Sequence, residues 1–446
     1  MGKVNLANLK KTIYYLKRNG IFGTIYAVQE RMADKSVKEY EWVPLPENEL
    51  KIQREKATGL SEICVSIVVP TYRTPRVFLL ELIQSVQNQS YSNWELVLAD
   101  ASEDDSVKDV VDEVSEERIK YLHLEKNEGI SVNTNQGIAL AKGDYVGLLD
   151  HDDILTPNAL YEMVSEIEKK KQQGIELELL YSDEDKCDQT GTRYFEPHLK
   201  MDFNLDLLFS NNYICHFMMM KKELIQELRL REEFDGAQDF DLMLRAVDRL
   251  YGKWEKISHV SKVLYHWRCH SSSTAENPGS KMYAYEAGRR AVQDFANHRG
   301  WKVTVKNTNH LGFYRLHYER PVFEERPEIG AVGYPIIQNG RISGGIMNLE
   351  GKPLYAGLRK HFSGYMHRAA LQQDAAALDI RNIEVRPQLQ YLFQELFQTD
   401  YVVRKDTNRF DITALPEGTN PVEAGVRLSE AIRRKGFLLL YFPNQD

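Results

Sequence analysis

The sequence predicts an α/β protein in which helices flank a mostly parallel sheet, and two observations support this class. The run 65–70 (VSIVVP) is short and almost continuously apolar, which is typical of a strand buried on both faces. From there to residue 149, strand-like and helix-like segments alternate every ~25 to 30 residues, as expected for βαβ crossovers between parallel strands. We therefore expect a Rossmann-like sheet whose ligands bind beyond the carboxyl ends of its strands.

Hydrophobic periodicity and turn residues predict the individual elements. Apolar runs predict strands, and segments with helical spacing predict helices; the strands are expected at 65–70, 94–99, 119–124 and 145–149, and the helices at 78–87, 106–114 and 131–141. Residues 1 to about 35 also have helical spacing, with a break at Asn19-Gly20. A polar, charge-rich connector is expected from there to residue 62.

The composition narrows the class of protein. With 446 residues, of which 42% are hydrophobic and 27% charged, the chain has enough apolar material for two or three domains. Its net charge of -8 argues against a nucleic-acid-binding protein, whose affinity comes from neutralising phosphates. The 4 cysteines are isolated in the sequence, so neither a disulfide framework nor a zinc site is expected. Because the sequence has neither a membrane-spanning run nor a cleavable leader, we expect a cytoplasmic protein.

The N-terminal segment is basic, and two interpretations of it are open. Up to Arg18 it contains lysines and an arginine but no acidic residue. It is either an amphipathic helix on the anionic inner face of the cell membrane or a helix packed on the protein with a solvated basic face.

An acidic cluster directly follows the predicted strand at 145–149. Asp150, Asp152 and Asp153 supply three carboxylates within four positions, and such crowded like charges are costly unless a cation lies among them. Mg²⁺ or Mn²⁺ would use one or two of these carboxylates and leave its other positions to phosphate oxygens and water. The alternative is a polar loop that caps a helix beginning at Thr156-Pro157. We favour the metal–phosphate interpretation because capping does not require three acids.

Polar residues also follow the first two predicted strands. Pro70-Thr71-Tyr72 and Asp100 stand at neighbouring strand ends, where they can read a nucleobase edge and ribose hydroxyls. Either group alone would be an ordinary turn. Asn127 in the following turn either lines the same cleft or caps the next helix.

Residues from about 64 to 300 resemble a family 2 glycosyltransferase with the GT-A fold. The resemblance rests on six motifs in order: VSIVVPTY, NWELVLADAS, NEGISVNTNQGIALAKGDYVGLLDHDD, YSDEDK, FDGAQDFDL and LYHWRCHSSST. It implies that Asp150-His151-Asp152 is the D-x-D motif, with Asp152 as the direct metal ligand. It also implies that the nucleotide base is held by Pro70, Thr71, Tyr72 and Asp100.

The same resemblance implies that Asp239 is the general base. Many relatives have Glu-Asp at this place, whereas here Gln238 precedes the aspartate and leaves it available. Inverting transfer needs a carboxylate to take the acceptor hydroxyl's proton and a cation at the leaving diphosphate, where Arg268 or His270 can assist a metal. Asp239 can instead be a carboxylate favoured by a helix N-terminus, and His270 an ordinary loop histidine.

The acceptor side is expected at a second acidic group. By resemblance, the strand end at Asp183, Glu184 and Asp185 faces the acceptor, although a solvated acidic loop is an alternative. Trp267 can stack on a sugar ring, although aromatic residues more often lie in a core.

We therefore predict three domains: an N-terminal helical segment and connector (1–62), a GT-A domain (63–305) and a small α+β accessory domain (306–446). In the last, 329–347 predicts a strand, a turn at Asn339-Gly340 and another strand. This domain faintly resembles part of a second glycosyltransferase unit, but it has no second D-x-D motif. Acceptor binding, homo-oligomerisation and docking are its open roles.

The expected function is metal-dependent, inverting transfer of a sugar from a UDP- or dTDP-sugar to a saccharide, with a lipid-linked glycan of bacterial surface polysaccharide synthesis as the acceptor implied by resemblance. A nucleotidyltransferase that makes sugar nucleotides is one alternative, but it would need a glycine-rich loop where this chain has Pro70-Thr71-Tyr72. A non-catalytic carbohydrate-binding scaffold is the other alternative, and the intact acidic motifs argue against it.

Overall fold

The computed structural model describes residues 40–60, 62–270, 282–405 and 407–443, together with 16, 20–21 and 23–30. The chain forms two compact units. The sheet unit comprises Glu39–Phe203 and Asn212–Phe295, and the C-terminal unit comprises Met1–Lys38, Asn204–Asn211 and Ala296–Asp446. Both units are assembled from separate segments of chain, whereas the predicted boundaries at 62 and 305 divide the chain into continuous domains.

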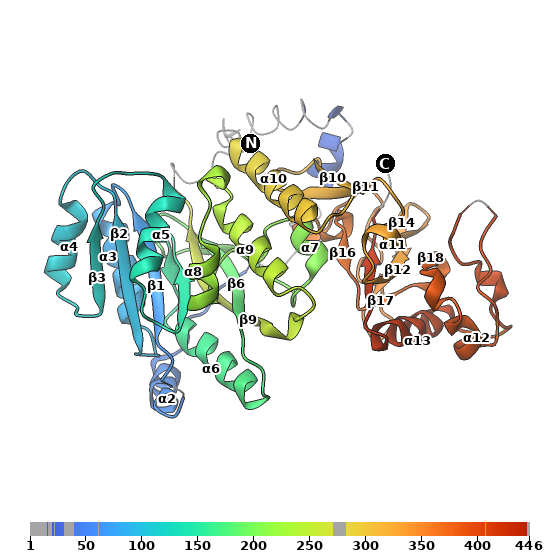
Figure 1. Cartoon of the computed structure of the whole chain (residues 1–446), viewed down its shortest axis with the longest axis horizontal. Helices are drawn as coiled ribbons and strands as arrows, with labels where there is room; N and C mark the ends of the chain where they lie inside the picture. The colour runs from blue at the N-terminus through green and yellow to red at the C-terminus, as the bar shows by residue number, and fades with distance from the viewer. Residues whose placement is uncertain are drawn as a thin grey trace, which may run out of the picture. The chain divides into compact units, whose positions relative to one another are not determined.

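The first half of the sheet unit's central sheet is parallel. It contains β1 (Val65–Thr71), β2 (Trp94–Asp100), β3 (Ile119–His123) and β4 (Tyr145–Leu148) in the order β3-β2-β1-β4. Figure 1 shows β3, β2 and β1 side by side. These strands coincide with the predicted ones to within one residue at each end. Because they are parallel, their carboxyl ends meet at one edge of the sheet, where the predicted site residues follow.

The second half of the sheet is mixed, which the sequence did not predict. β8 (Met218–Lys221) is antiparallel to both β4 and β6 (Leu179–Cys187), and β6 is parallel to β9 (Ile257–Arg268). β7 (Tyr194–His198) and β5 (Ile154–Leu155) add antiparallel pairings. The α/β class is confirmed, but the parallel arrangement is confined to part of the sheet.

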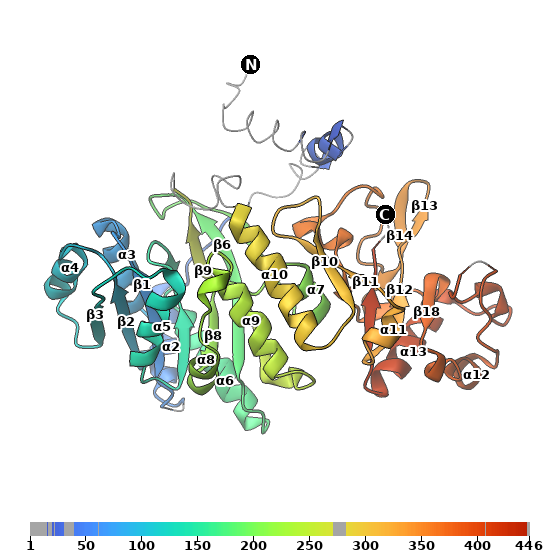
Figure 2. The same ribbon diagram turned by 45° about the horizontal axis from the view of Figure 1, so that its top comes forward.

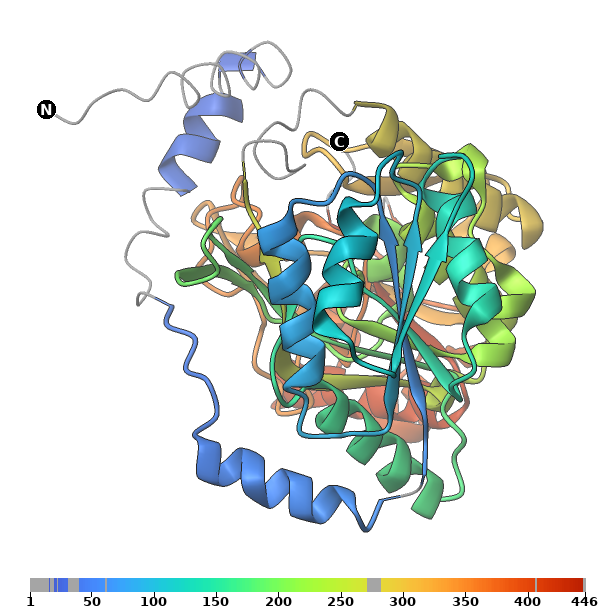
Figure 3. The same cartoon turned by 90° about the vertical axis from the view of Figure 1, so that its left-hand side faces the viewer.

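Helices cover both faces of this sheet. α3 (Arg76–Gln87), α4 (Ser106–Val114) and α6 (Ala159–Gln172) bury their apolar side chains in one core with residues of β1 and β2. On the opposite face lie α5 (Ile130–Leu140), α8 (Lys222–Leu228) and α9 (Gln238–Arg249); Figure 3 shows α3 and α4 on one side of the strands and α5 on the other. α10 (Met282–His298) continues the chain from this unit.

α5 packs on the sheet without an intervening side chain. A Cβ atom at Gly137 would lie 2.7 Å from Cγ1 of Val68 and 3.4 Å from the Cβ of Ala99. Real side chains do not approach so closely, so glycine here brings the helix backbone against β1 and β2.

The N-terminal predictions are only partly covered by the described residues. Residues 16, 20–21 and 23–30 are helical, and the rest of the predicted helix lies outside the described residues. The predicted connector contains α2 (Glu47–Ala57), with acids in its first turn and bases in its last, as the helix dipole favours. Within the described chain, no helix has both the length and the apolar character required to cross a bilayer.

The C-terminal unit is built around a smaller sheet in the order β16-β19-β12-β18; β12 and β18 are labelled in Figure 2. Its strands are short, and helices pack against them: β12 (Ile329–Gly333), β16 (Gln373–Asp374), β18 (Ile383–Val385), β19 (Leu438–Tyr441), α12 (Leu392–Phe397) and α13 (Pro421–Arg434). Two hairpins accompany it, β10 (Val303–Asn307) with β11 (Tyr314–Tyr318), and β13 (Ile336–Gln338) with β14 (Arg341–Gly344). The smaller elements are α7 (Leu205–Ser210), α11 (Val322–Glu325), β15 (Ile346–Met347) and β17 (Ala377–Leu378).

The turn predicted at Asn339-Gly340 is confirmed. Both residues have positive φ, 49° and 72°, and they connect the paired residues Gln338 and Arg341. A two-residue hairpin turn with positive φ at both positions is the reason for the Asn-Gly pair.

A buried ion pair explains why α7 belongs to the C-terminal unit. The guanidinium of Arg326 donates to both carboxylate oxygens of Asp206 at 2.9 Å, and neither side chain is more than 2% exposed. Asp374 accepts from the backbone N–H of Leu205 at 2.7 Å. Burial beside Asp206 raises the pKa of Asp374 well above its usual value, which favours a protonated Asp374 next to the charged pair.

Replacing Asp206 with alanine is expected to lower the free energy of unfolding by about 3 kcal/mol, the lower end for breaking a buried ion pair, because Arg326 would remain charged and buried with only Glu328 as an acidic partner. Equilibrium urea unfolding followed by circular dichroism measures this change. Glu430→Ala is the control, since it removes the exposed partner of Arg434 and should cost less than about 1 kcal/mol. Equal effects of the two substitutions would contradict the structural role of the buried pair.

Candidate active site

The acidic turn follows β4 directly and is closed by the backbone. The N–H of Leu149 continues the ladder by donating to the carbonyl of Val68, and the N–H of Asp153 donates to the carbonyl of Asp150 at 3.2 Å. The side chains of Asp150 and Asp152 remain 46% and 18% exposed. The turn therefore presents two carboxylates at the carboxyl end of the parallel strands.

The third carboxylate, Asp153, points into the protein. It is fully buried and accepts hydrogen bonds from the Tyr265 hydroxyl and, at 2.7 Å, from the backbone N–H of Arg268. Burial raises the pKa of Asp153 well above its usual range, and the neighbouring Asp152 and Asp150 add to the increase. Asp153 thus anchors the turn to β9 and is not exposed to a ligand, which the sequence alone did not distinguish.

Arg268 ends β9 and His270 lies two residues later, and both contact the acidic turn after β4. Nε2 of His270 lies 2.7 Å from Oδ2 of Asp152. Arg268 is fully buried; its Nε donates to the carbonyl of Asp152 at 2.6 Å, and its guanidinium lies 2.6 Å from Glu81. The structure therefore places Arg268 beneath the acidic turn, and its contact with a donor phosphate stays a prediction.

Asp239 lies in the first turn of α9, and described residues form hydrogen bonds to only one of its two carboxylate oxygens. Its Oδ2 accepts from the side-chain amide of Asn212 at 2.8 Å and from the thiol of Cys215 at 3.0 Å. Burial, together with Asp239 itself, raises the pKa of Cys215 well above its usual value, so the thiol keeps its proton and donates. No described residue bonds to Oδ1, which is the oxygen left for another partner.

Two consecutive residues bring Asp239 and the acidic turn together. Cys215 contacts Asp239, and the next residue, His216, has Nε2 3.9 Å from Oδ2 of Asp150 and stacks on Tyr265 at 4.6 Å. Although Asp150 is partly exposed, the surrounding protein raises its pKa, and Asp152 and Asp239 contribute while His216 opposes the increase. The segment 212–216 thus joins the two predicted carboxylate groups, and no sequence signal identified this joining role.

The predicted nucleotide-binding residues lie at the neighbouring strand ends. Asp100 is fully buried and accepts from Thr71 at 3.1 Å, from Ser102 at 2.7 Å and from Tyr121 at 2.9 Å. Pro70 and Thr71 end β1, and Thr71 is buried. These bonds make Asp100 the point that joins the ends of β1, β2 and β3.

The neighbouring loop residues differ in exposure. Tyr72 is 37% exposed and donates to Glu103. Two residues further on, Thr74 lies 3.1 Å from His151, which brings the loop after β1 against the acidic turn. Asn127 accepts from the N–H of Gly129 and from the side-chain amide of Asn133, so it stabilises the turn before α5, whose N-cap residue is Gly129. Its contact with a donor stays a prediction.

The three acids expected on the acceptor side lie inside β6, not in a solvated loop. Each has a histidine partner: Asp183 with His259 at 2.9 Å, Glu184 with His198 at 3.0 Å, and Asp185 with His266. Burial alone would raise the pKa of Glu184, but Lys200 and His198 lower it to about 2. Trp267 is partly buried against the main core and lies beneath Lys186. The loop alternative was wrong, because all three acids are buried within a strand and each contacts a histidine.

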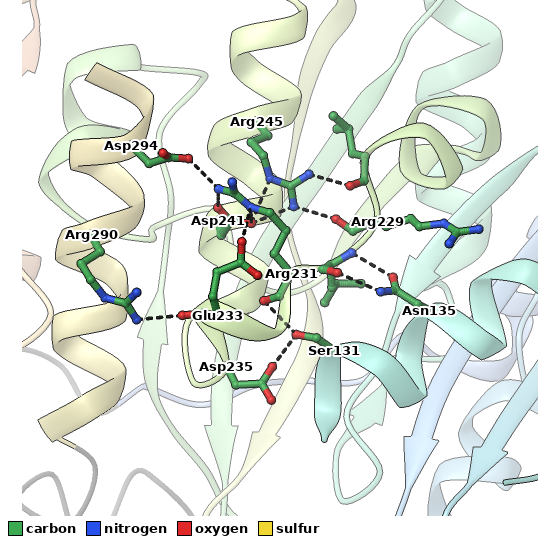
Figure 4. Close-up of polar contacts among 12 residues, drawn as sticks. Ser131, Asn135, Arg229, Arg231, Glu233, Asp235, Asp241, Arg245, Arg290 and Asp294 are labelled. Carbon is green, nitrogen blue, oxygen red and sulfur yellow. Dashed lines mark hydrogen bonds and ion pairs between the residues drawn. The ribbon is translucent and has the colours of Figure 1, made fainter. Parts of the chain in front are cut away.

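A buried arginine–aspartate network fixes the beginning of α9 (Figure 4). Asp241, two residues after Asp239 and 1% exposed, accepts from Arg231 at 3.1 Å and from Arg245 at 2.9 and 2.7 Å. Arg231 also reaches Asp294 of α10 at 2.7 Å, and Arg245 donates to two backbone carbonyls of the preceding loop. Asp241 stands in the motif FDGAQDFDL, but the sequence analysis assigned it no role.

The described residues fit a hard divalent cation that also binds a ligand. Within the described chain, no group of three or more His, Cys, Asp or Glu side chains is arranged to hold a metal by itself. Mg²⁺ and Mn²⁺ commonly bind one or two carboxylates and complete their shell with phosphate and water oxygens. The outward carboxylates of Asp150 and Asp152 supply that donor set.

Comparison with known proteins agrees with this arrangement. Residues 66–229 match the family described as glycosyl transferase family 2. The chain therefore contains a segment, from β1 through α8, that matches family 2 glycosyltransferases, and the α/β class of its central sheet is the one that the motifs predicted.

Three relatives each match part of this chain. The uncharacterized protein y4gI of Sinorhizobium fredii is 41% identical over 52% of this chain and 25% of its own length. The O-antigen biosynthesis protein RfbC of Myxococcus xanthus is 34% identical over 59% of this chain and 21% of its own. The GalNAc(5)-diNAcBac-PP-undecaprenol beta-1,3-glucosyltransferase of Campylobacter jejuni is 32% identical over 39% and 57%. The chain thus spans about a quarter or less of the length of the first two. The crystal structure of S. aureus TarS 1-349 is 19% identical, with a TM-score of 0.41, over 52% of this chain and 65% of that structure.

Replacing Asp241 with alanine is expected to destabilise the protein by about 3 kcal/mol, near the lower limit for breaking a buried ion pair, because both arginines still reach solvent. The measurement is equilibrium unfolding in urea. Glu227→Ala is the control. It removes an exposed partner of Arg249, which lies in α9 with Asp241, and it should have almost no effect on stability. A near-neutral Asp241→Ala would show that the network does not hold α9.

Proposed function

We propose that the chain is an inverting, metal-dependent glycosyltransferase that transfers a sugar from a nucleotide-diphosphate donor to a saccharide acceptor. The observation that supports this most directly is the segment 212–216, which joins Asp239 to the outward carboxylates of the acidic turn. One carboxylate group suits a cation with a diphosphate, and the other suits a proton acceptor. The match to a glycosyltransferase family supports the same reaction class.

The proposed chemistry is a single displacement at the donor's anomeric carbon. The acceptor hydroxyl forms the new glycosidic bond, the bond from that carbon to the diphosphate breaks, and the hydroxyl proton moves to Oδ1 of Asp239. Asn212 and Cys215 hold Oδ2, so Oδ1 keeps one orientation. A positioned carboxylate of this kind typically contributes ~10²- to 10⁴-fold in rate.

Asp150 and Asp152 would hold the divalent cation, Mn²⁺ or Mg²⁺. When bound, the cation supplies positive charge at the donor's diphosphate and stabilises its departure. The side chain of His270 orients Asp152 through the 2.7 Å contact, and Asp153 and Arg268 fix the turn from beneath. Their buried positions make these two residues supports for the site.

The donor and acceptor identities follow from weaker observations. We propose a UDP- or dTDP-sugar, with its base near Pro70, Thr71, Tyr72, Asp100 and Asn127. The names of the relatives from Myxococcus and Campylobacter favour a surface-polysaccharide acceptor, including a lipid-linked glycan.

Among the residues proposed for the acceptor, Trp267 is the one that remains partly exposed and able to contact a sugar. The histidine partners of Asp183, Glu184 and Asp185 favour a supporting role for these acids.

Asp152→Ala should abolish the enhancement of UDP-sugar or dTDP-sugar binding by Mn²⁺, because the cation loses its direct ligand. Isothermal titration calorimetry with and without Mn²⁺ measures this effect. Asp112→Ala, at an exposed position in α4, is the matched control and should keep the enhancement. Unchanged metal-dependent binding in Asp152→Ala would remove this residue from the site.

Asp239→Asn should leave donor affinity within about twofold but reduce turnover ~10²-fold or more, since the amide cannot accept the acceptor proton. Nucleotide release from the donor in the presence of acceptor glycans measures turnover. Asp112→Asn provides the control. Turnover close to that of the unchanged protein would disprove the role of Asp239 as base.

A further inference from the structure

A cavity of about 870 Å³ lies within the C-terminal unit and is separate from the residues assigned to catalysis. Its lining comes from the hairpin β10–β11, from residues 23–30, from the loop 360–363 and from β12 with its following turn. Its volume is within the range of cavities that bind small molecules. Nothing in the proposed transfer reaction uses this cavity.

Positive charge dominates its ionisable lining. Lys306 and Arg315 are directly opposite each other in the antiparallel register of β10 and β11, and both line the cavity. Like charges at directly opposed positions destabilise a hairpin. Arg320 and Lys360 add two further cations to the lining.

Lys306 and Lys360 differ in their pairing from Arg320, whose Nε lies 3.8 Å from Oε1 of Glu325. Neither Lys306 nor Lys360 forms an ion pair with any residue in the described part of the chain. The acids in the lining are Glu30 and Glu384, and both have other partners: Glu30 accepts from the N–H of Gly364 at 2.6 Å and from Ser363, and Glu384 accepts from Tyr334. The lining therefore has cationic side chains that an anionic ligand can pair with.

Aromatic rings and short polar side chains share the lining with these cations. Tyr26 stacks on His361 with ring centroids 4.5 Å apart, and Tyr334 also faces the cavity. Asn307 and Asn408 supply amide groups among them. Flat rings beside amides and hydroxyls match the alternating apolar faces and hydroxyl edges of a sugar.

We propose that this cavity binds an anionic saccharide, a short glycan with carboxylate or phosphate groups. The preference for an anion follows from Lys306 and Lys360, whereas the choice of a saccharide also rests on the proposed function. The C-terminal unit would then hold a charged glycan at a site distinct from the one that performs transfer.

The test uses the full chain and two probes of equal length. One is a tetrasaccharide of alternating glucuronic acid and N-acetylglucosamine, and the other is the neutral tetrasaccharide of N-acetylglucosamine. Isothermal titration calorimetry should show binding of the acidic probe that weakens as salt is raised, and much weaker binding of the neutral probe. Lys306→Ala combined with Lys360→Ala should weaken the acidic probe about tenfold or more, because charge-assisted hydrogen bonds are lost.

Matched controls separate this site from general charge attraction and from the catalytic site. Lys352→Ala with Lys435→Ala removes two exposed lysines of the same unit outside the cavity and should leave binding unchanged. Asp152→Ala should also bind the acidic probe normally, so failure of the proposed transfer function would not affect this result. The proposal would be overturned by equal binding of both probes or by no binding of the acidic probe. It would also be overturned by equal losses in the two lysine double variants, or by displacement of the acidic probe by UDP alone.

Discussion

The orientation of the candidate active site depends on one buried carboxylate, Asp153. Three acids in four positions would repel one another if all faced the same point. The protein directs Asp153 inward, where the Tyr265 hydroxyl and the Arg268 N–H satisfy it. This attaches the turn after β4 to β9, and the two remaining carboxylates, Asp150 and Asp152, face outward. The position of the outward pair is therefore set by backbone and buried groups rather than by flexible surface contacts.

The same arrangement occurs at the beginning of α9. Asp241 is buried between Arg231 and Arg245, while Asp239, two residues earlier, is held through one oxygen only. In both motifs an inward acid fixes the element and a nearby acid remains available to a ligand. Such anchoring limits the freedom of the available carboxylate, which is what proton transfer in a fixed geometry requires.

Local patterns explain which parts of this structure the sequence could predict. The strands β1 to β4 are apolar runs with adjacent turn signals, so their positions were predictable. Long-range pairing decided the rest: Tyr265 is 112 residues from Asp153, and Arg326 is 120 residues from Asp206. No local signal shows which acid in a cluster will find such a partner. For the same reason the short strands β5 and β8, whose place depends on neighbours distant in sequence, were not predicted.

Clusters of charged residues in this chain either support the fold or remain available to a ligand, depending on whether they have partners in the protein. In β6 each of the three consecutive acids pairs with a histidine of β7 or β9, and these pairs connect neighbouring strands of the sheet. In the cavity of the C-terminal unit, Lys306 and Lys360 have no acidic partner among the described residues, and Lys306 directly opposes Arg315. A buried charge with a partner stabilises a fold only when its desolvation is offset, whereas an unpaired charge at a cavity keeps its capacity to bind a ligand. Pairing, and not charge density in the sequence, therefore separates structural clusters from sites that bind ligands.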